Sequence, residues 1–344
     1  MIKHFSGSLA FTAFGLLLAA LVGWESSGSL DGTLECVFIV AVLSVLEVSL
    51  SFDNAVVNAT VLQEMDEVWR RRFLTWGIAI AVFGMRIVFP LVVVVAVGRI
   101  SPWEAVIMAA TNPAEYARHL TEAHISVSAF GGAFLVMVGL KHFLDADKEV
   151  HWLEFIERPL TRLGRIEAVQ LGLVLLLLWG ISNLVGVHER LEFLVAGIFG
   201  LLTYITVDGV GALLGDASDE VHEVRARTGL SAFLYLEVLD ASFSFDGVIG
   251  AFALSTNLLI IAIGLGIGAV FVRSLTILLV ERGTLTEYRY LEHGAFYAIL
   301  ALGFIMFLQA FLEIPEVVTG LIGGVLIGWS FVSSLRYNRR EGRG

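Results

Sequence analysis

The sequence has few of the features that build disulfide-rich, zinc-finger or nucleic-acid-binding proteins. Its one cysteine, Cys36, excludes an internal disulfide and a cysteine-based zinc site. Charged residues are 16% of 344, against about 25% in a typical soluble domain. The net charge is −11 and no basic block is present, which argues against a nucleic-acid partner. No nucleotide-binding P-loop and no H-E-x-x-H motif occur, so an ATP-driven pump and a zinc protease are not indicated.

Hydrophobic residues dominate instead, at 57% of the chain, and the mean hydropathy is +0.83. They form about ten apolar segments, each long enough to cross a bilayer as a helix of about 20 residues. The segments are 6–24, 34–60, 73–98, 126–144, 168–187, 191–214, 230–255, 257–280, 292–312 and 315–335. We therefore predict an all-α, polytopic membrane protein.

The basic residues predict its orientation. With a cytoplasmic N-terminus, sixteen of the 22 Lys and Arg fall in cytoplasmic segments and only three outside. The positive-inside rule then places both termini in the cytoplasm, as in a multi-pass protein of the cell inner membrane. We expect the first segment to be retained, with a cleaved signal peptide as the alternative. The connection 145–167 is expected to hold an amphipathic helix on the membrane surface.

The most informative feature is a duplicated motif. The segments Glu47–Val56 and Asp240–Ile249 both read acid-x-Ser-apolar-Ser-Phe-Asp, then a small or polar residue and two apolar ones. The next segments also align, through Gly77–Arg86 and Gly264–Arg273. Because five spans separate the two copies, they have opposite orientation, and inverted repeats are typical of secondary transporters.

The predicted organisation therefore has five parts, of which two are three-helix repeats. They are an N-terminal helix and loop (1–33), repeat 1 (34–144), an amphipathic linker with two extra helices (145–229), repeat 2 (230–312), and a C-terminal helix with a basic tail (313–344).

Acids inside apolar segments indicate an ion site. Each would cost about 2.5–3.5 kcal/mol near a helix centre, so they must be paired, protonated, hydrated or bound to a cation. Carboxylate, amide and hydroxyl oxygens suit Mn²⁺, Ca²⁺ or Mg²⁺. The six acids are Glu47, Asp53, Asp208, Glu237, Asp240 and Asp246.

Helical spacing divides the polar residues into two matching stripes. Glu47, Ser51, Asn54 and Asn58 make the first stripe, and Glu237, Asp240, Ser244 and Gly247 make the second. Asp53 and Asp246 lie about 100° away on a regular helix. Two arrangements remain open: the helix unwinds near Ser-Phe-Asp and they join the stripe, or they pair with Arg86 and Arg273.

For other polar residues, a structural explanation competes with a functional role. The serines, including Ser51 and Ser244, are more simply explained as contacts between helices. Asp208 repeats the pattern around Asp246 but lies outside the repeat. His293 begins a span, where it is either a proton relay or a polar helix-terminal residue.

At these residues the chain resembles the TerC family of integral membrane proteins. Glu47 to Asn54 is similar to its E-x(5)-D-N signature, and Glu237 to Asp246 to its E-x-x-D-x(5)-D signature. Gly247 departs from the Ser found in many members. The family is grouped with LysE-type transporters and associated with manganese efflux. The resemblance implies metal roles for Glu47, Asp53, Asn54, Glu237, Asp240 and Asp246.

The expected function is thus export of a hard divalent cation, most simply Mn²⁺, by a secondary transporter with protons as the candidate counter-ion. The metal ion and the lipid bilayer are the expected partners, and no firmly bound cofactor and no enzymatic activity are expected. Two alternatives stay open: a LysE-type exporter of a small organic solute, and a non-transporting membrane scaffold in metal or tellurite stress. The sequence leaves the oligomeric state open.

Overall fold

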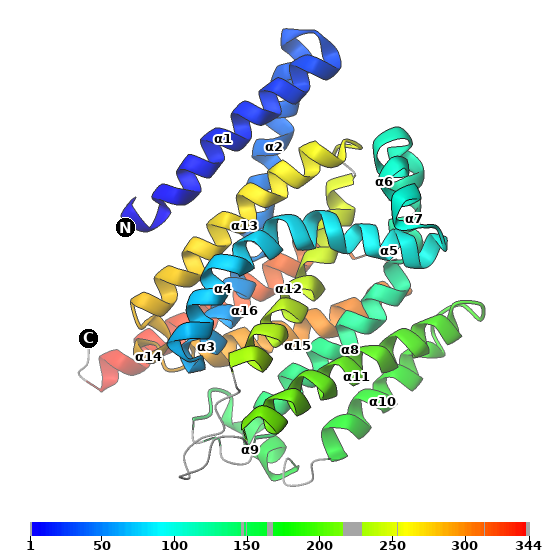
Figure 1. Cartoon of the computed structure of the whole chain (residues 1–344). Coiled ribbons are helices and arrows are strands. Elements are labelled where there is room, and N and C mark those ends of the chain that lie inside the picture. Colours follow the sequence, from blue (N-terminus) through cyan, green and yellow to red (C-terminus); the bar gives the residue numbers. More distant parts are fainter. Residues whose placement is uncertain are drawn as a thin grey trace. The chain divides into compact units, whose positions relative to one another are not determined.

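The computed structural model describes residues 2–145, 148, 150–163, 168–215, 229–252, 254–312 and 314–341, and every regular element in these ranges is a helix (Figure 1). The helices are α1 (Ile2–Ser27), α2 (Leu30–Leu50), α3 (Phe52–Glu64), α4 (Glu67–Ala79), η1 (Ile80–Val88), α5 (Phe89–Gly98), α6 (Pro102–Thr111), α7 (Pro113–Glu122), α8 (His124–Phe143), α9 (Glu154–Leu163), α10 (Ala168–Ser182), α11 (Arg190–Gly215), α12 (Gly229–Phe252), α13 (Leu258–Glu281), α14 (Thr284–Glu287), α15 (Leu291–Gln309) and α16 (Glu316–Arg340). The predicted all-α fold class is confirmed for this part of the chain. Glu313, in the predicted tight break before the last span, and most of the linker 216–229 lie outside the described residues.

Eight helices in the described ranges are long and apolar enough to cross a membrane. They cover Phe5–Ser27, Leu30–Leu50, Ile80–Gly98, His124–Phe143, Arg190–Gly209, Leu258–Glu281, Leu291–Gln309 and Val318–Arg340. The chain therefore has the helices of a multi-pass membrane protein, as predicted. Two of the ten predicted spans differ: α10 has only 15 residues, and α12 has the length but carries three acids. For these two, membrane crossing stays a prediction.

The chain divides into two compact units that do not follow the predicted repeats. Unit 1 contains Met1–Ala55, Arg71–His124 and Phe243–Leu278. Unit 2 contains Val56–Arg70, Ile125–Ser242 and Leu279–Gly344. Each predicted repeat, 34–144 and 230–312, thus contributes residues to both units.

Unit 1 is organised around α13, the most buried of its membrane-length helices. In Figure 1, α1 and α2 run side by side, and α5, α6 and α7 pack together. A small apolar core joins α1, α2 and α13 through Ala19, Val40 and Ile267. Polar contacts add to it, since Ser8 Oγ lies 2.6 Å from Ser274 Oγ.

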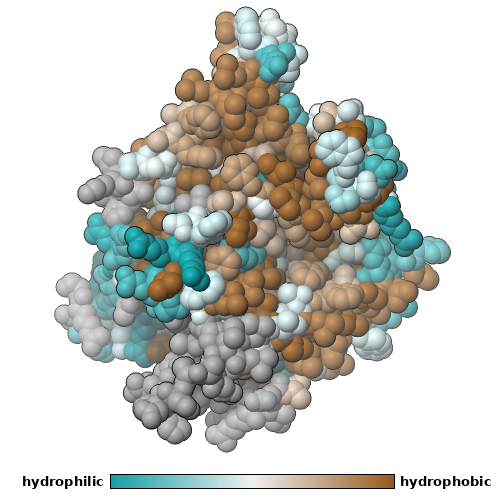
Figure 2. All heavy atoms as spheres, in the orientation of Figure 1, coloured by the Kyte–Doolittle hydropathy of each residue, from teal (hydrophilic) through white to brown (hydrophobic). Residues whose placement is uncertain are grey.

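Unit 2 is organised around α8 and α15, which are mostly buried, while α16 packs on α15 and α11 packs on α10. One ion pair links α8 to α11: Lys141 Nζ lies 2.7 Å from Asp208 Oδ1, and both side chains are partly exposed. Apolar side chains cover much of the molecular face drawn in Figure 2, as expected of helices that meet lipid.

The predicted amphipathic helix lies within unit 2 as α9. It exposes Phe155 and Leu163 while it buries Glu157 completely. An exposed apolar face suits a helix at the membrane surface, and this location stays a prediction.

Candidate functional site

The first motif contains a helix break at Ser51, which separates α2 from α3. The Ser51 N–H still donates to the Glu47 carbonyl at 3.0 Å, and its hydroxyl donates to Glu47 Oε1 at 3.1 Å. Asp53 sits in the first turn of α3, where its Oδ1 accepts the Asn54 N–H at 2.9 Å. The helix dipole favours a carboxylate at this position. The motif therefore places two buried carboxylates, Glu47 and Asp53, on either side of a break.

Glu47 forms a buried ion pair with Arg86. The Arg86 Nη2 donates to Glu47 Oε1, and the two side chains are 3% and 6% exposed. Arg86 Nη1 also donates to the Ala81 carbonyl at 2.6 Å. The pairing of Arg86 with an acid of its own repeat was one of the predicted arrangements, but the acid is Glu47 instead of Asp53.

Two glycines of the second repeat border Glu47 inside unit 1. A Cβ added at Gly247 would lie 3.4 Å from Glu47 Oε2. A Cβ added at Gly268 would overlap the Glu47 Cβ and lie 3.0 Å from the Ser44 carbonyl oxygen. Glycine at position 268 lets α13 approach α2 at the level of the acid, whereas a Cβ at Gly247 would make an ordinary contact with the Glu47 carboxylate. Gly247 of the second motif copy therefore borders the Glu47 carboxylate.

Arg273 has a different environment from Arg86, although the alignment makes them equivalent. It donates through Nη2 to the Phe73 carbonyl, and its guanidinium lies 3.6 Å from the centroid of the Phe73 ring. The local helix geometry also differs. Arg86 lies within the π-helical segment η1, in which hydrogen bonds span five residues, whereas Arg273 lies in the α-helix α13.

The remaining predicted residues are placed as follows. Ser244 is buried in unit 1, and its Oγ has no hydrogen-bond partner among the described residues. Asn58 is buried in α3, on the part of that helix that belongs to unit 2. Glu237 and Asp240 lie half-buried in the unit 2 part of α12. Asp246 also lies in α12, but its side chain is outside the described part of the structure.

The predicted metal ligands are thus only partly assembled within one unit. Unit 1 brings together Glu47, Ser51 and Arg86, with Asp53 and Asn54 immediately across the break. Among the residues that are described, no three His, Cys, Asp or Glu side chains are grouped closely enough to hold a metal ion.

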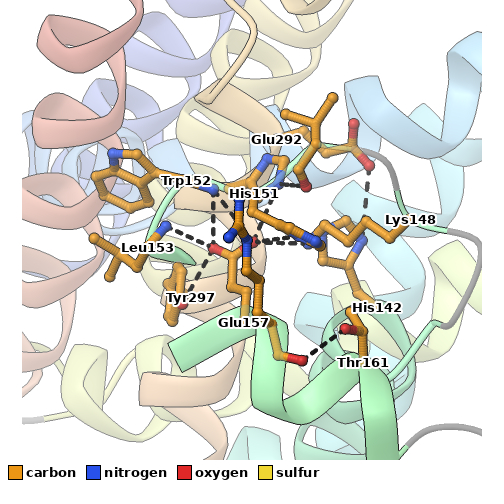
Figure 3. Close-up of polar contacts among 12 residues, drawn as sticks. His142, Lys148, His151, Trp152, Leu153, Glu157, Thr161, Glu292 and Tyr297 are labelled. Atoms are coloured by element: carbon orange, nitrogen blue, oxygen red, sulfur yellow. Dashed lines mark hydrogen bonds and ion pairs between the residues drawn. The ribbon is translucent and has the colours of Figure 1, made fainter. Parts of the chain in front are cut away.

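A second polar cluster surrounds Glu157 in unit 2 and was not predicted as a site (Figure 3). It includes His293, whose Nε2 lies 2.8 Å from the Val150 carbonyl oxygen and 3.5 Å from Glu157 Oε2. This contact ties the connection before α9 to the start of α15, and both interpretations of His293 stay predictions. The other members, His142, Lys148 and His151, carry no motif, and only the amphipathic pattern of 145–167 pointed to this region.

The fold defines a helical, multi-pass membrane protein with buried ion pairs in both of its units. Residues 52–341 match the family described as "Protein of unknown function (DUF475)", and the chain belongs to this family. No curated protein and no solved structure was found to be similar to it.

Proposed function

We propose that the protein is a TerC-like secondary transporter that exports a hard divalent cation, most simply Mn²⁺, through a carboxylate-lined path. The observation that carries the proposal is the buried Glu47 carboxylate. It is held by Arg86, it stands next to a helix break, and Gly247 of the second motif copy faces it. Intramembrane acids in such settings mark ion pathways.

The chemistry of the site suits reversible binding of a cation. Arg86 compensates the charge of Glu47, so the site does not combine two uncompensated carboxylates before the ion arrives. Asp53, Asn54 and Ser51 supply carboxylate, amide and hydroxyl oxygens, which are hard ligands. Broken helices supply ion sites in transporters because their free backbone groups and side chains converge at the break.

Six residues are proposed as ligands in the transport cycle: Glu47, Asp53, Asn54, Glu237, Asp240 and Asp246. Arg86 is proposed as a positioning residue that sets the charge of the site, and Arg273 as a residue that anchors α13 through Phe73. Orientation with both termini in the cytoplasm and outward transport are both part of this proposal.

The test is cation flux in proteoliposomes that contain the purified full-length protein. Mn²⁺, Ca²⁺, Mg²⁺ and Zn²⁺ are compared with a metal-sensitive dye inside the vesicles. We expect Mn²⁺ flux above that of Zn²⁺, and a loss of at least about tenfold in Asp53→Asn. Asp31→Asn is the matched control, since Asp31 is an exposed acid in the first turn of α2.

Other results would replace the proposal. Absence of flux for all four ions, together with counter-flow of a cationic amino acid, would favour the organic-solute exporter. Absence of both would favour the scaffold. Wild-type Mn²⁺ flux in both Asp53→Asn and Asp246→Asn would remove the duplicated acids from the mechanism.

A further inference from the structure

Helices α6 and α7 form a short hairpin that follows directly on a membrane-length helix of unit 1. Only residues 99–101 connect the end of α5 at Gly98 to the start of α6. The apolar helix that ends at Gly98 has 19 residues, close to the about 20 that are needed to cross a bilayer. When this helix crosses a bilayer, Gly98 lies near one face of the hydrocarbon layer. The connection reaches at most about 14 Å from there, so α6 is held near the membrane–water boundary.

The start of α6 is a defined helix end. Arg99 ends α5 in the left-handed backbone region, with a φ of 49°, so the chain turns there and α6 does not continue the span. Ser101 and Glu104 form a capping box, in which the Glu104 N–H donates to Ser101 Oγ at 3.2 Å and the Ser101 N–H donates to Glu104 Oε2 at 2.7 Å. Because a carboxylate already occupies this helix end, it does not provide a site for an anion.

The surface of α6 has three different faces. Ala105 and Ala109 are buried on the side that packs against α5 and α7. Opposite them lies an exposed apolar arc that is about 100° wide, counted at about 100° per residue. The members of this α6 apolar arc are Trp103, Val106, Ile107 and Ala110. Glu104 and Thr111 are exposed along one edge of the arc. A protein side, an apolar side and a polar side are what a helix needs when it lies in a membrane interface.

The second helix of the hairpin exposes charge instead. Arg118 of α7 pairs with Glu115 and Glu122, and all three side chains are exposed. The inward side of α7 buries Tyr116 and Leu120. Water therefore suits the exposed side of α7, whereas the α6 apolar arc is stabilised only when apolar groups cover it.

The interfacial region of the bilayer is the partner that fits the α6 apolar arc. Trp103 is 71% exposed, and Val106 and Ile107 are 42% and 44% exposed. Tryptophan is enriched at membrane–water interfaces, because its ring is apolar and carries one N–H donor. The four residues of the arc are far fewer than the about 20–30 that each partner contributes to a stable protein–protein interface. Lipid needs no such minimum area, and the connection to α5 already places the arc beside it.

We propose that α6 is an interfacial membrane helix that inserts Trp103, Val106 and Ile107 among the lipid headgroups and the upper part of the acyl chains. Glu104 and the charged side of α7 stay in water. Helices of this kind bury their apolar face about 5–10 Å into the boundary region, which is within reach of the connection to α5. The proposal does not depend on the solute that the protein carries.

Spin labels on single cysteines test the proposal in the full-length protein, reconstituted into bilayers of phosphatidylcholine and phosphatidylglycerol. Cys36→Ser removes the one cysteine of the chain, and Val106→Cys then places a nitroxide on the α6 apolar arc. Collision rates are measured with oxygen, which concentrates in apolar layers, and with a nickel chelate, which stays in water. Thr121→Cys on the exposed side of α7 is the matched control. Val92→Cys, at an exposed position of α5, is the reference for a membrane-spanning helix.

We expect the ratio of oxygen to nickel collisions at position 106 to exceed the ratio at position 121 by at least about fivefold, because an apolar gas and a polar chelate partition in opposite directions across the boundary. The ratio at position 106 should stay below that at position 92, since α6 lies in the interface and not in the hydrocarbon core. Ile107→Cys should behave like Val106→Cys, and Thr111→Cys, on the polar edge of α6, should give a ratio between those at 106 and 121.

Three results would overturn the proposal. Equal ratios at positions 106 and 121 would place α6 in water. Equally high ratios at positions 106 and 111 would place the whole helix in the hydrocarbon core. Low collision rates with both reagents at position 106 would show that protein covers the arc, and spin–spin broadening that disappears on dilution with unlabelled protein would identify it as a second copy of the chain. If Val106→Cys does not fold, the Ile107→Cys label decides between the same outcomes.

Discussion

Replacing Arg86 with Gln should destabilise the protein strongly, because it leaves a buried carboxylate without its ion-pair partner. Glu47 and Arg86 are 6% and 3% exposed, so neither is screened by bulk water. Removing one partner of such a pair costs about 3–5 kcal/mol. The glutamine amide is too short to reproduce both the contact with Glu47 and the bond to the Ala81 carbonyl. We expect a loss near the lower end of this range, since Ser51 continues to donate to Glu47.

The assay is equilibrium unfolding in mixed micelles, with Arg118→Gln as the control. Arg118 pairs with Glu115 and Glu122 on the exposed side of α7, so its loss should change the free energy of unfolding by less than about 1 kcal/mol. The double variant Glu47→Gln/Arg86→Gln should recover at least about 1 kcal/mol relative to the sum of the single changes. Strict additivity of the two substitutions would show that the ion pair does not carry this stability.

Three further changes test other contacts. Gly268→Ala should destabilise the protein by about 1–3 kcal/mol in the same unfolding assay, because the new Cβ overlaps the Glu47 Cβ. Gly7→Ala is the control and should not destabilise it, because nothing lies near the added atom. Lys148→Gln should remove a rise in the free energy of unfolding at alkaline pH. Burial lowers the pKa of Lys148 in the folded protein below its usual value of 10.5. Between the two pKa values the unfolded chain binds more protons than the folded one, so the wild-type protein becomes more stable as the pH rises. Lys141→Gln should cost less than about 1 kcal/mol in the same assay, because the Lys141–Asp208 pair is partly exposed; a cost above about 3 kcal/mol would mean that the pair is desolvated in the membrane.

Apolar length was sufficient to predict the helical class, and the duplicated motif placed Glu47 among six candidate acids. Long apolar runs leave the chain no alternative to helices, since each backbone group must be satisfied within its own segment. The break beside Asp53 was one of two arrangements left open, because unwinding depends on how the neighbouring helices pack. The match of Arg86 to Glu47 was not predictable, because the motif spacing does not reveal that Arg86 lies in a π-helical segment.

The Glu157 cluster was out of reach of sequence analysis for a different reason. Its members come from the end of α8, the connection before α9, α9 itself and the start of α15, and no spacing rule relates them. His293 drew attention only as a polar residue in an apolar helix. Contacts between segments separated by more than a hundred residues follow from packing, which a single sequence does not reveal.

The π-helical segment η1 has a consequence for the history of the two copies. A π turn accommodates one more residue than the α turn it replaces, so it behaves as an insertion absorbed within a helix. Among the described residues of the two proposed copies, only the first copy carries it. Deleting a single residue between 80 and 85 would return the segment to α geometry and rotate Arg86, together with the start of α5, by about 100° relative to α4. A one-codon deletion would then redirect the arginine from Glu47 while it shortens the span by one residue and leaves its polarity unchanged.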